Sequence, residues 1–124
     1  MSFNWSDYLI LAKNLAGKTL LPCQEAQFRS AISRAYYAAF CSARNLIIQK
    51  GDTISSNSKA HKEVQSFFEK RKDIISKEIQ SDLDRLRKDR NDADYKDKFP
   101  GKLNEKTTFD LYFAQRVVND LAKI

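Results

Sequence analysis

The sequence predicts an all-α protein, a four- to five-helix up-down bundle that forms a single domain over residues 1–124. Three observations support this prediction. The sequence contains 3 glycines and 2 prolines, too few for the frequent turns of an all-β fold. Apolar residues recur at helical spacing along several segments that contain no breaker. A chain of 124 residues is also long enough to bury a core without a metal or a disulfide.

Two helices are expected in the first part of the chain. Asn4 or Ser6 suits the N-cap of the first helix, and Gly17 suits its end. Pro22 fits the first position of the second helix, which continues without a breaker to Gly51. The second helix has apolar residues on more than one face and many alanines, which permit close packing. We therefore expect it to be the central helix of the bundle.

Three more helices are expected after the loop "GDTISSNSK". Residues 56–58 offer an N-cap for the third helix, and Pro100–Gly101 marks the turn after the fourth. Asn104 is expected to cap the last helix. The inward positions expected in that helix are Phe109, Tyr112 or Phe113, Arg116 or Val117, and Leu121.

Composition limits the classes of function. The net charge of +6 permits a nucleic acid or an acidic partner but establishes neither. No signal peptide or long apolar run is present, so we expect a cytoplasmic protein that does not cross a membrane, with Cys23 and Cys41 reduced. No Cys/His cluster has metal-ligand spacing and no glycine-rich phosphate loop occurs, so neither a metal nor a cofactor is expected.

The apolar stripe of the fourth helix ends in an arginine. Its apolar members are Ile75, Ile79, Leu83 and Leu86. One further step of four residues reaches Arg90, whose guanidinium needs a partner because burying an unpaired charge is costly. Two alternatives stay open at this point. Arg90 either pairs internally, with Asp94 or with a carboxylate of another helix, or it lies at a crevice or subunit seam where it can bind a phosphate.

A second cluster lies in the long helix. Arg34 and Tyr37 are three residues apart and share adjoining parts of one face. Arg34 either forms an ion pair with an acidic residue of the fourth helix, such as Asp84 or Asp94, or flanks the crevice of Arg90 together with Tyr37.

Two further side chains have open roles. Arg87, in "LRKDR", is either solvated or extends a phosphate-binding surface. His61 is the only histidine, so any histidine-based catalysis depends on it. The simpler interpretation of His61 is a residue at the start of a helix, partly packed against the long helix.

Two stretches, "RSAISRAYYAAFCSARNLI" and "LRKDRNDADY", together resemble the HEPN domains (higher eukaryotes and prokaryotes nucleotide-binding), in particular the small single-domain prokaryotic members. The resemblance covers nearly the whole chain. It implies a four- or five-helix bundle that commonly forms homodimers. It also implies an RNase, often the toxin of a toxin–antitoxin pair whose partner is a small nucleotidyltransferase, with two copies of an Arg-Asn…His motif meeting in a composite RNA cleft.

Mapped onto this chain, Arg90 and Asn91 match the Arg-Asn of the family and Tyr95 takes the position of its histidine. Histidine suits proton transfer because its ordinary pKa is about 6.5, whereas the pKa of tyrosine is near 10. Asp94 could act as the base instead. The expected catalytic residues are Arg90, Asn91, Asp94 and Tyr95, and the expected substrate contacts are Arg34, Tyr37 and Arg87. The alternatives are a non-catalytic module that binds a nucleotide, RNA or a protein, and a purely structural helical protein.

Overall fold

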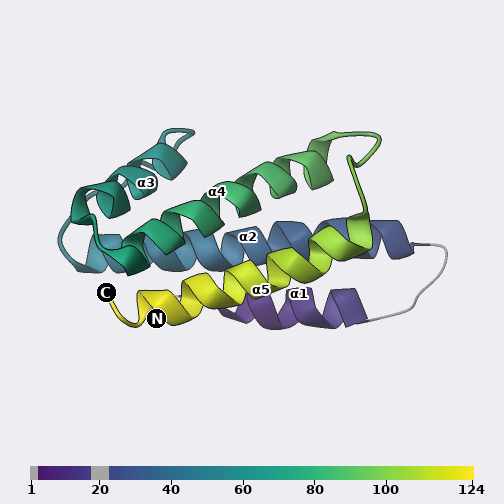
Figure 1. Cartoon of the computed structure of the whole chain (residues 1–124), viewed down its shortest axis with the longest axis horizontal. Helices are drawn as coiled ribbons and strands as arrows, with labels where there is room; N and C mark the ends of the chain where they lie inside the picture. The colour runs from purple at the N-terminus through teal and green to yellow at the C-terminus, as the bar shows by residue number, and fades with distance from the viewer. Residues whose placement is uncertain (1–2, 18–22) are drawn as a thin grey trace.

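The computed structural model describes residues 3–17 and 23–124, which form five helices and no strand (Figure 1). The helices are α1 (Asp7–Gly17), α2 (Gln24–Gln49), α3 (Ala60–Arg71), α4 (Ile74–Tyr95) and α5 (Leu103–Leu121). The predicted all-α class is therefore confirmed.

The long helix α2 is the centre of the bundle and contacts each of the other four helices. In Figure 1 it runs through the middle of the molecule, with α1 and α5 on one side and α3 and α4 on the other. Its alanines make the close packing possible: Ala31, Ala35, Ala38, Ala39 and Ala43 are buried. The prediction of a central helix is confirmed.

Local chemistry sets the helix ends, and the sequence predicted some of them. Gly51 follows α2 at a φ of 104°, a left-handed conformation that favours glycine. Asp73 caps α4, since its carboxylate accepts the backbone N–H of Ser76 at 2.7 Å. The cap predicted at Asn104 is wrong, because α5 already begins at Leu103.

The predicted start of the third helix is also early. Asn57 makes a turn ahead of α3, in which its side chain accepts the backbone N–H of Lys59, and the helix begins at Ala60. Pro22 lies outside the described residues.

The buried face of α5 agrees with the predicted one at Val117 and Leu121 and differs from it at Phe109. Its buried members are Thr107, Asp110, Ala114, Val117, Asp120 and Leu121. Phe109, predicted to face inward, is 56% exposed, and the neighbouring Asp110 is fully buried in its place. The sequence pattern favoured the aromatic residue because it could not show that Asp110 would be buried beside Asp89, which is itself 5% exposed.

The described residues contain no helix that is long and apolar enough to cross a membrane. Both cysteines are free, and Cys41 is buried like a small apolar residue.

An ion pair with a buried carboxylate joins α4 to α5. The Arg116 guanidinium donates to both carboxylate oxygens of Asp82, each at 2.8 Å, and Asp82 is fully buried. Such a two-pronged contact fixes the relative position of two helices, and losing one partner leaves the other charge unpaired.

We predict that Arg116→Met lowers the free energy of unfolding by about 3 kcal/mol, because it leaves the Asp82 carboxylate buried without its partner. Urea denaturation measures the change. The double variant Asp82→Leu/Arg116→Met should recover most of the loss. An equal loss in the matched variant Arg85→Met, whose guanidinium lies over the Phe113 ring, would contradict this explanation.

Asp110 makes the stability of the fold depend on pH. Burial, with the carboxylate of Asp89 beside it, raises its pKa to about 9 against an ordinary value of 3.8. Between these values the folded state holds one more proton than the unfolded chain, so stability falls as the pH rises. We predict that Asp110→Asn flattens this dependence and is more stable than the wild type at pH 8. A series of thermal melts across this range, with equal slopes for both proteins, would contradict the assignment.

Candidate functional site

Arg90 lies where α4 crosses α2, at the end of the buried stripe formed by Ile79, Leu83 and Leu86. Its guanidinium carbon lies 4.8 Å from the ring centre of Tyr36 and 5.5 Å from that of Tyr37. The side chain is only 15% exposed. Two aromatic faces therefore hold a largely buried cation, an arrangement that stabilises the charge without a buried carboxylate.

The polar contacts of Arg90 are few. Its Nη1 lies 3.9 Å from the Asp94 carboxylate, a long ion pair, and its buried Nε has no hydrogen-bond partner among the described residues. Asp94 also accepts the Ser33 hydroxyl at 3.3 Å, which ties it back to α2. The internal pair that the sequence offered as one alternative is present, but it leaves donor capacity on the guanidinium free.

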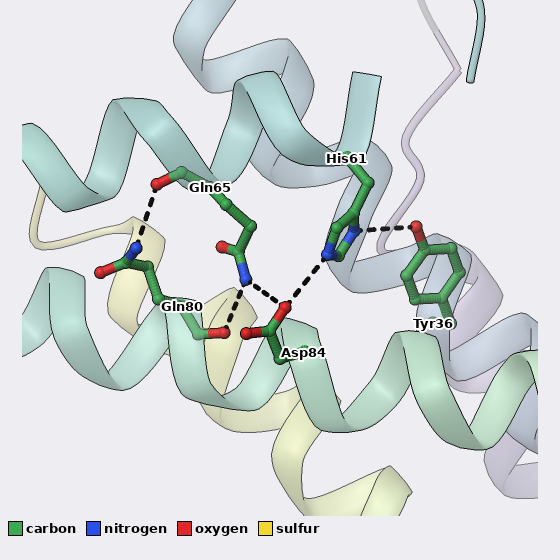
Figure 2. A network of polar contacts seen from close by, with 5 residues as sticks. All are labelled: Tyr36, His61, Gln65, Gln80 and Asp84. Atoms are coloured by element: carbon green, nitrogen blue, oxygen red, sulfur yellow. Dashed lines mark hydrogen bonds and ion pairs between the residues drawn. The ribbon is translucent and has the colours of Figure 1, made fainter. Parts of the chain in front are cut away.

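A chain of hydrogen bonds fixes the Tyr36 ring from the side of α3 (Figure 2). The Tyr36 hydroxyl lies 3.3 Å from His61 Nδ1, and His61 Nε2 lies 3.3 Å from the Asp84 carboxylate. A carboxylate only accepts, so Nε2 carries the proton and Nδ1 accepts the Tyr36 O–H. His61 also stacks on the Phe40 ring at 5.8 Å. The interpretation of His61 as packed on the long helix is confirmed.

Two glutamines extend this chain along the α3–α4 contact (Figure 2). Gln65 donates to the Asp84 carboxylate at 2.8 Å and to the Gln80 backbone carbonyl at 2.9 Å. Gln80 donates in return to the Gln65 carbonyl at 3.1 Å. The network therefore holds α3 against α4 and keeps the tyrosine under Arg90 in place.

Burial controls the protonation of these groups. It raises the pKa of Tyr36 to about 12, although Arg90 and Arg87 pull in the opposite direction. Burial also lowers the pKa of His61, as do the positive charges of Arg87 and Arg90, while Asp84 opposes the change. At neutral pH the Tyr36 phenol and the His61 imidazole are both uncharged. Arg87 belongs to the electrostatic surroundings of this cluster and lies at its exposed edge.

The remaining expected catalytic residues lie near the end of α4. Asn91 is half-buried, next to Arg90 in the helix. Tyr95, which takes the position of the family histidine, is 76% exposed. Within one chain, then, Arg90, Asp94 and Tyr37 are brought together, whereas Tyr95 faces solvent.

Arg34 makes a contact that the sequence did not indicate. Its guanidinium carbon lies 5.0 Å from the ring centre of Tyr8 on α1. No described carboxylate lies within 4.0 Å of it, so the suggested ion pair with Asp84 or Asp94 is wrong. Asp84 is instead occupied by His61 and Gln65.

The site is suited to an anion. The guanidinium carries a positive charge, has no short carboxylate contact and has planar N–H donors, the group type that pairs with carboxylates and phosphates in proteins. No described group of three or more His, Cys, Asp or Glu side chains is placed to hold a metal ion. Sequence reasoning missed the connection of His61 to Arg90 through Tyr36, because the contact joins α2, α3 and α4 and leaves no spacing signal in the chain.

We predict that His61 titrates below its ordinary pKa of 6.5. The folded state then binds fewer protons than the unfolded chain just below pH 6.5, so stability decreases as the pH falls through this region. The imidazole C–H signals in an NMR titration give the midpoint without ambiguity, because His61 is the only histidine in the sequence. A midpoint at or above 6.5 would contradict the buried, neutral imidazole.

The sequence was compared with protein families, curated proteins and solved structures. A family model described as HEPN domain matches residues 17–124. The chain has no significant match among curated proteins or among solved structures. The matched region contains α2, α3, α4 and α5 and thus every side chain described above as contacting Arg90. The chain belongs to the HEPN family.

Proposed function

We propose that the protein is a homodimeric RNA-acting protein that binds the RNA backbone at Arg90 and cleaves it without a metal ion. The observation that supports this most strongly is the state of Arg90. Its guanidinium is largely buried over Tyr36 and Tyr37, contacts Asp94 only at 3.9 Å, and has an Nε–H that is buried without a hydrogen-bond partner in the described part of the chain. An arginine with a purely structural role would be expected to have a short carboxylate contact, as Arg116 has with Asp82.

The proposed reaction needs a base, an acid and a cation. The Asp94 carboxylate takes the proton of the ribose 2′-hydroxyl, and the 2′-oxygen attacks the phosphorus. The bond from phosphorus to the 5′-oxygen breaks, and that oxygen takes a proton from the Tyr95 hydroxyl, leaving a 2′,3′-cyclic phosphate. Arg90 balances the added charge on the phosphate, and Asn91 orients it. The ordinary pKa of tyrosine, near 10, suits a donor better than a base.

The exposure of Tyr95 is the reason for proposing a dimer. At 76% exposed it does not contribute to the Arg90 cluster of its own chain. A second copy packed against the end of α4 would bring its Tyr95 to the phosphate. In this arrangement Tyr37 and Arg87 border the phosphate beside Arg90, since Tyr37 lies under the guanidinium and Arg87 precedes it by one turn of α4.

A protein that cuts RNA inside a cell needs a partner that inhibits its cleavage activity. We propose that the protein acts as the toxin of a toxin–antitoxin or defence pair, with a nucleotidyltransferase-type antitoxin as its partner. This part rests on the resemblance to the small single-domain members of the family. Growth arrest on expression, relieved by a neighbouring gene product, is the observation that would test it.

A second candidate is a binding module that does not cut RNA. It is favoured by the burial of His61 and Tyr36, at 7% and 3% exposed, which keeps both groups away from a ribose hydroxyl. Asp94 is then the one base beside Arg90 among the described residues. Binding at Arg90 without cleavage is the signature of this candidate.

We predict that the purified protein cleaves a mixed RNA pool in EDTA and that Arg90→Ala abolishes cleavage. The expected loss is at least about 100-fold, the usual size for removal of a group that stabilises transition-state charge. Tyr95→Phe should reduce cleavage strongly while leaving RNA binding unchanged. The readout is the appearance of 2′,3′-cyclic phosphate ends.

Arg85→Ala is the matched control, since it removes a cation from the same helix on its α5 side, where Arg85 lies over Phe113. Cleavage by Arg90→Ala at the wild-type rate would refute the proposed role of Arg90. Tight RNA binding by the folded wild type with no cleavage would select the binding module instead.

A further inference from the structure

A stripe of residues along α2 connects the Arg90 site to α1. Arg34, Tyr37 and Arg44 follow one another at steps of three and seven residues and therefore share one helix face, with the buried Cys41 between Tyr37 and Arg44. From Arg34 to Arg44 this face extends about 15 Å at the rise of an α-helix. Arg90 of α4 reaches the stripe at Tyr37, 5.5 Å from the ring centre.

Each arginine of the stripe lies over an aromatic ring of the N-terminal segment. The Arg34 guanidinium carbon lies 5.0 Å from the Tyr8 ring centre, and that of Arg44 lies 5.4 Å from the Trp5 ring centre. Phe3, Trp5 and Tyr8 form one cluster through edge-to-face contacts of 4.9 to 5.4 Å. The aromatic cluster therefore fixes both cations on the same side of α2.

These cations are not neutralised within the described part of the chain. No described carboxylate lies within 4.0 Å of either guanidinium, whereas Arg29 and Arg116 each have a carboxylate partner. The one hydrogen bond found for Arg44 among the described residues joins its Nε to the neutral side chain of Asn45. A guanidinium that contacts a ring and no carboxylate retains N–H donors for phosphate oxygens.

We infer that this stripe is a binding track for single-stranded RNA, with Arg34 and Arg44 contacting successive parts of the backbone that Arg90 holds. Arginines combined with accessible aromatic rings are the usual means of holding single strands, because phosphates meet the cations and bases stack on the rings. Phe3 supplies such a ring and is 49% exposed. The inference rests on the proposed function, since it extends the same RNA path.

The chain offers a matched control for this track. Arg85 also lies over a ring, with its guanidinium carbon 4.9 Å from the Phe113 ring centre, and it also lacks a described carboxylate within 4.0 Å. It lies on α4 against α5, away from the α1–α2 face. Arg85→Ala thus removes one positive charge and one cation–ring contact, as Arg34→Ala and Arg44→Ala do, but leaves the stripe intact.

The test measures the affinity of the full chain for a short single-stranded RNA with 2′-O-methyl riboses, which cannot be cut by this chemistry, at several salt concentrations. For single strands, each lost phosphate contact reduces the slope of log affinity against log salt by about 0.7. We expect this reduction for Arg34→Ala, for Arg44→Ala and for Arg90→Ala, and an unchanged slope for Arg85→Ala. Arg34→Lys should keep the wild-type slope because it keeps the charge.

The outcomes separate the two proposals. An unchanged slope in Arg90→Ala would overturn the proposed function itself. A reduced slope in Arg90→Ala with unchanged slopes in Arg34→Ala and Arg44→Ala would overturn only the track.

The track is also refuted if Arg34→Lys behaves like Arg34→Ala, which would mark a structural role. Altered self-association in the alanine variants by sedimentation, with the RNA slope unchanged, would overturn the track and identify the stripe as a protein interface.

Discussion

The placement of one cation on two aromatic rings organises this molecule. Arg90 ends a core stripe of α4, so its charge enters a region that would otherwise be apolar. Tyr36 and Tyr37 of α2 accept it over their faces, at 4.8 and 5.5 Å, and the Tyr36 hydroxyl is held in turn by His61 of α3. Three helices are thus linked through the Tyr36 side chain, which contacts Arg90 of α4 with its ring and His61 of α3 with its hydroxyl. The two rings and the long ion pair with Asp94 together stabilise the charge, while the buried Nε–H has no hydrogen-bond partner among the described residues.

Contacts between a guanidinium and an aromatic ring recur around α2. Arg34 over Tyr8 and Arg44 over Trp5 repeat the contact of Arg90, and all three lie on or beside one face of the helix. The ion pairs elsewhere differ: Arg116 and Asp82 satisfy each other between α4 and α5. Arg116 also lies over the rings of Tyr112 and Phe113, so ring contacts occur both with and without a short carboxylate contact. Arg34 and Arg44 have a ring contact and no described carboxylate within 4.0 Å.

Much of this could be predicted from the sequence, and the failures have physical causes. The helical stripe of α4 and the position of Arg90 on it follow from residue spacing alone, as does the central role of the alanine-rich α2. Spacing ranks Phe109 above Asp110 as a core residue, because the carboxylate of Asp110 is accommodated only by the arrangement of α4 beside α5. The contacts of His61 and Arg34 likewise depend on which helices become neighbours, and a single sequence contains no signal for that.

The most direct test of the central claim follows the Arg90 side chain itself. Arginine Nε–H signals can be recorded by NMR while a short, uncleavable single-stranded RNA is added to the folded protein. The proposal places a phosphate against the Arg90 guanidinium, so we expect the signal of its Nε–H, which has no partner among the described residues, to shift and to reach a plateau as RNA saturates the site. The signal of Arg85 should stay in place. An Arg90 signal that does not move at saturating RNA would show that this arginine serves only the fold.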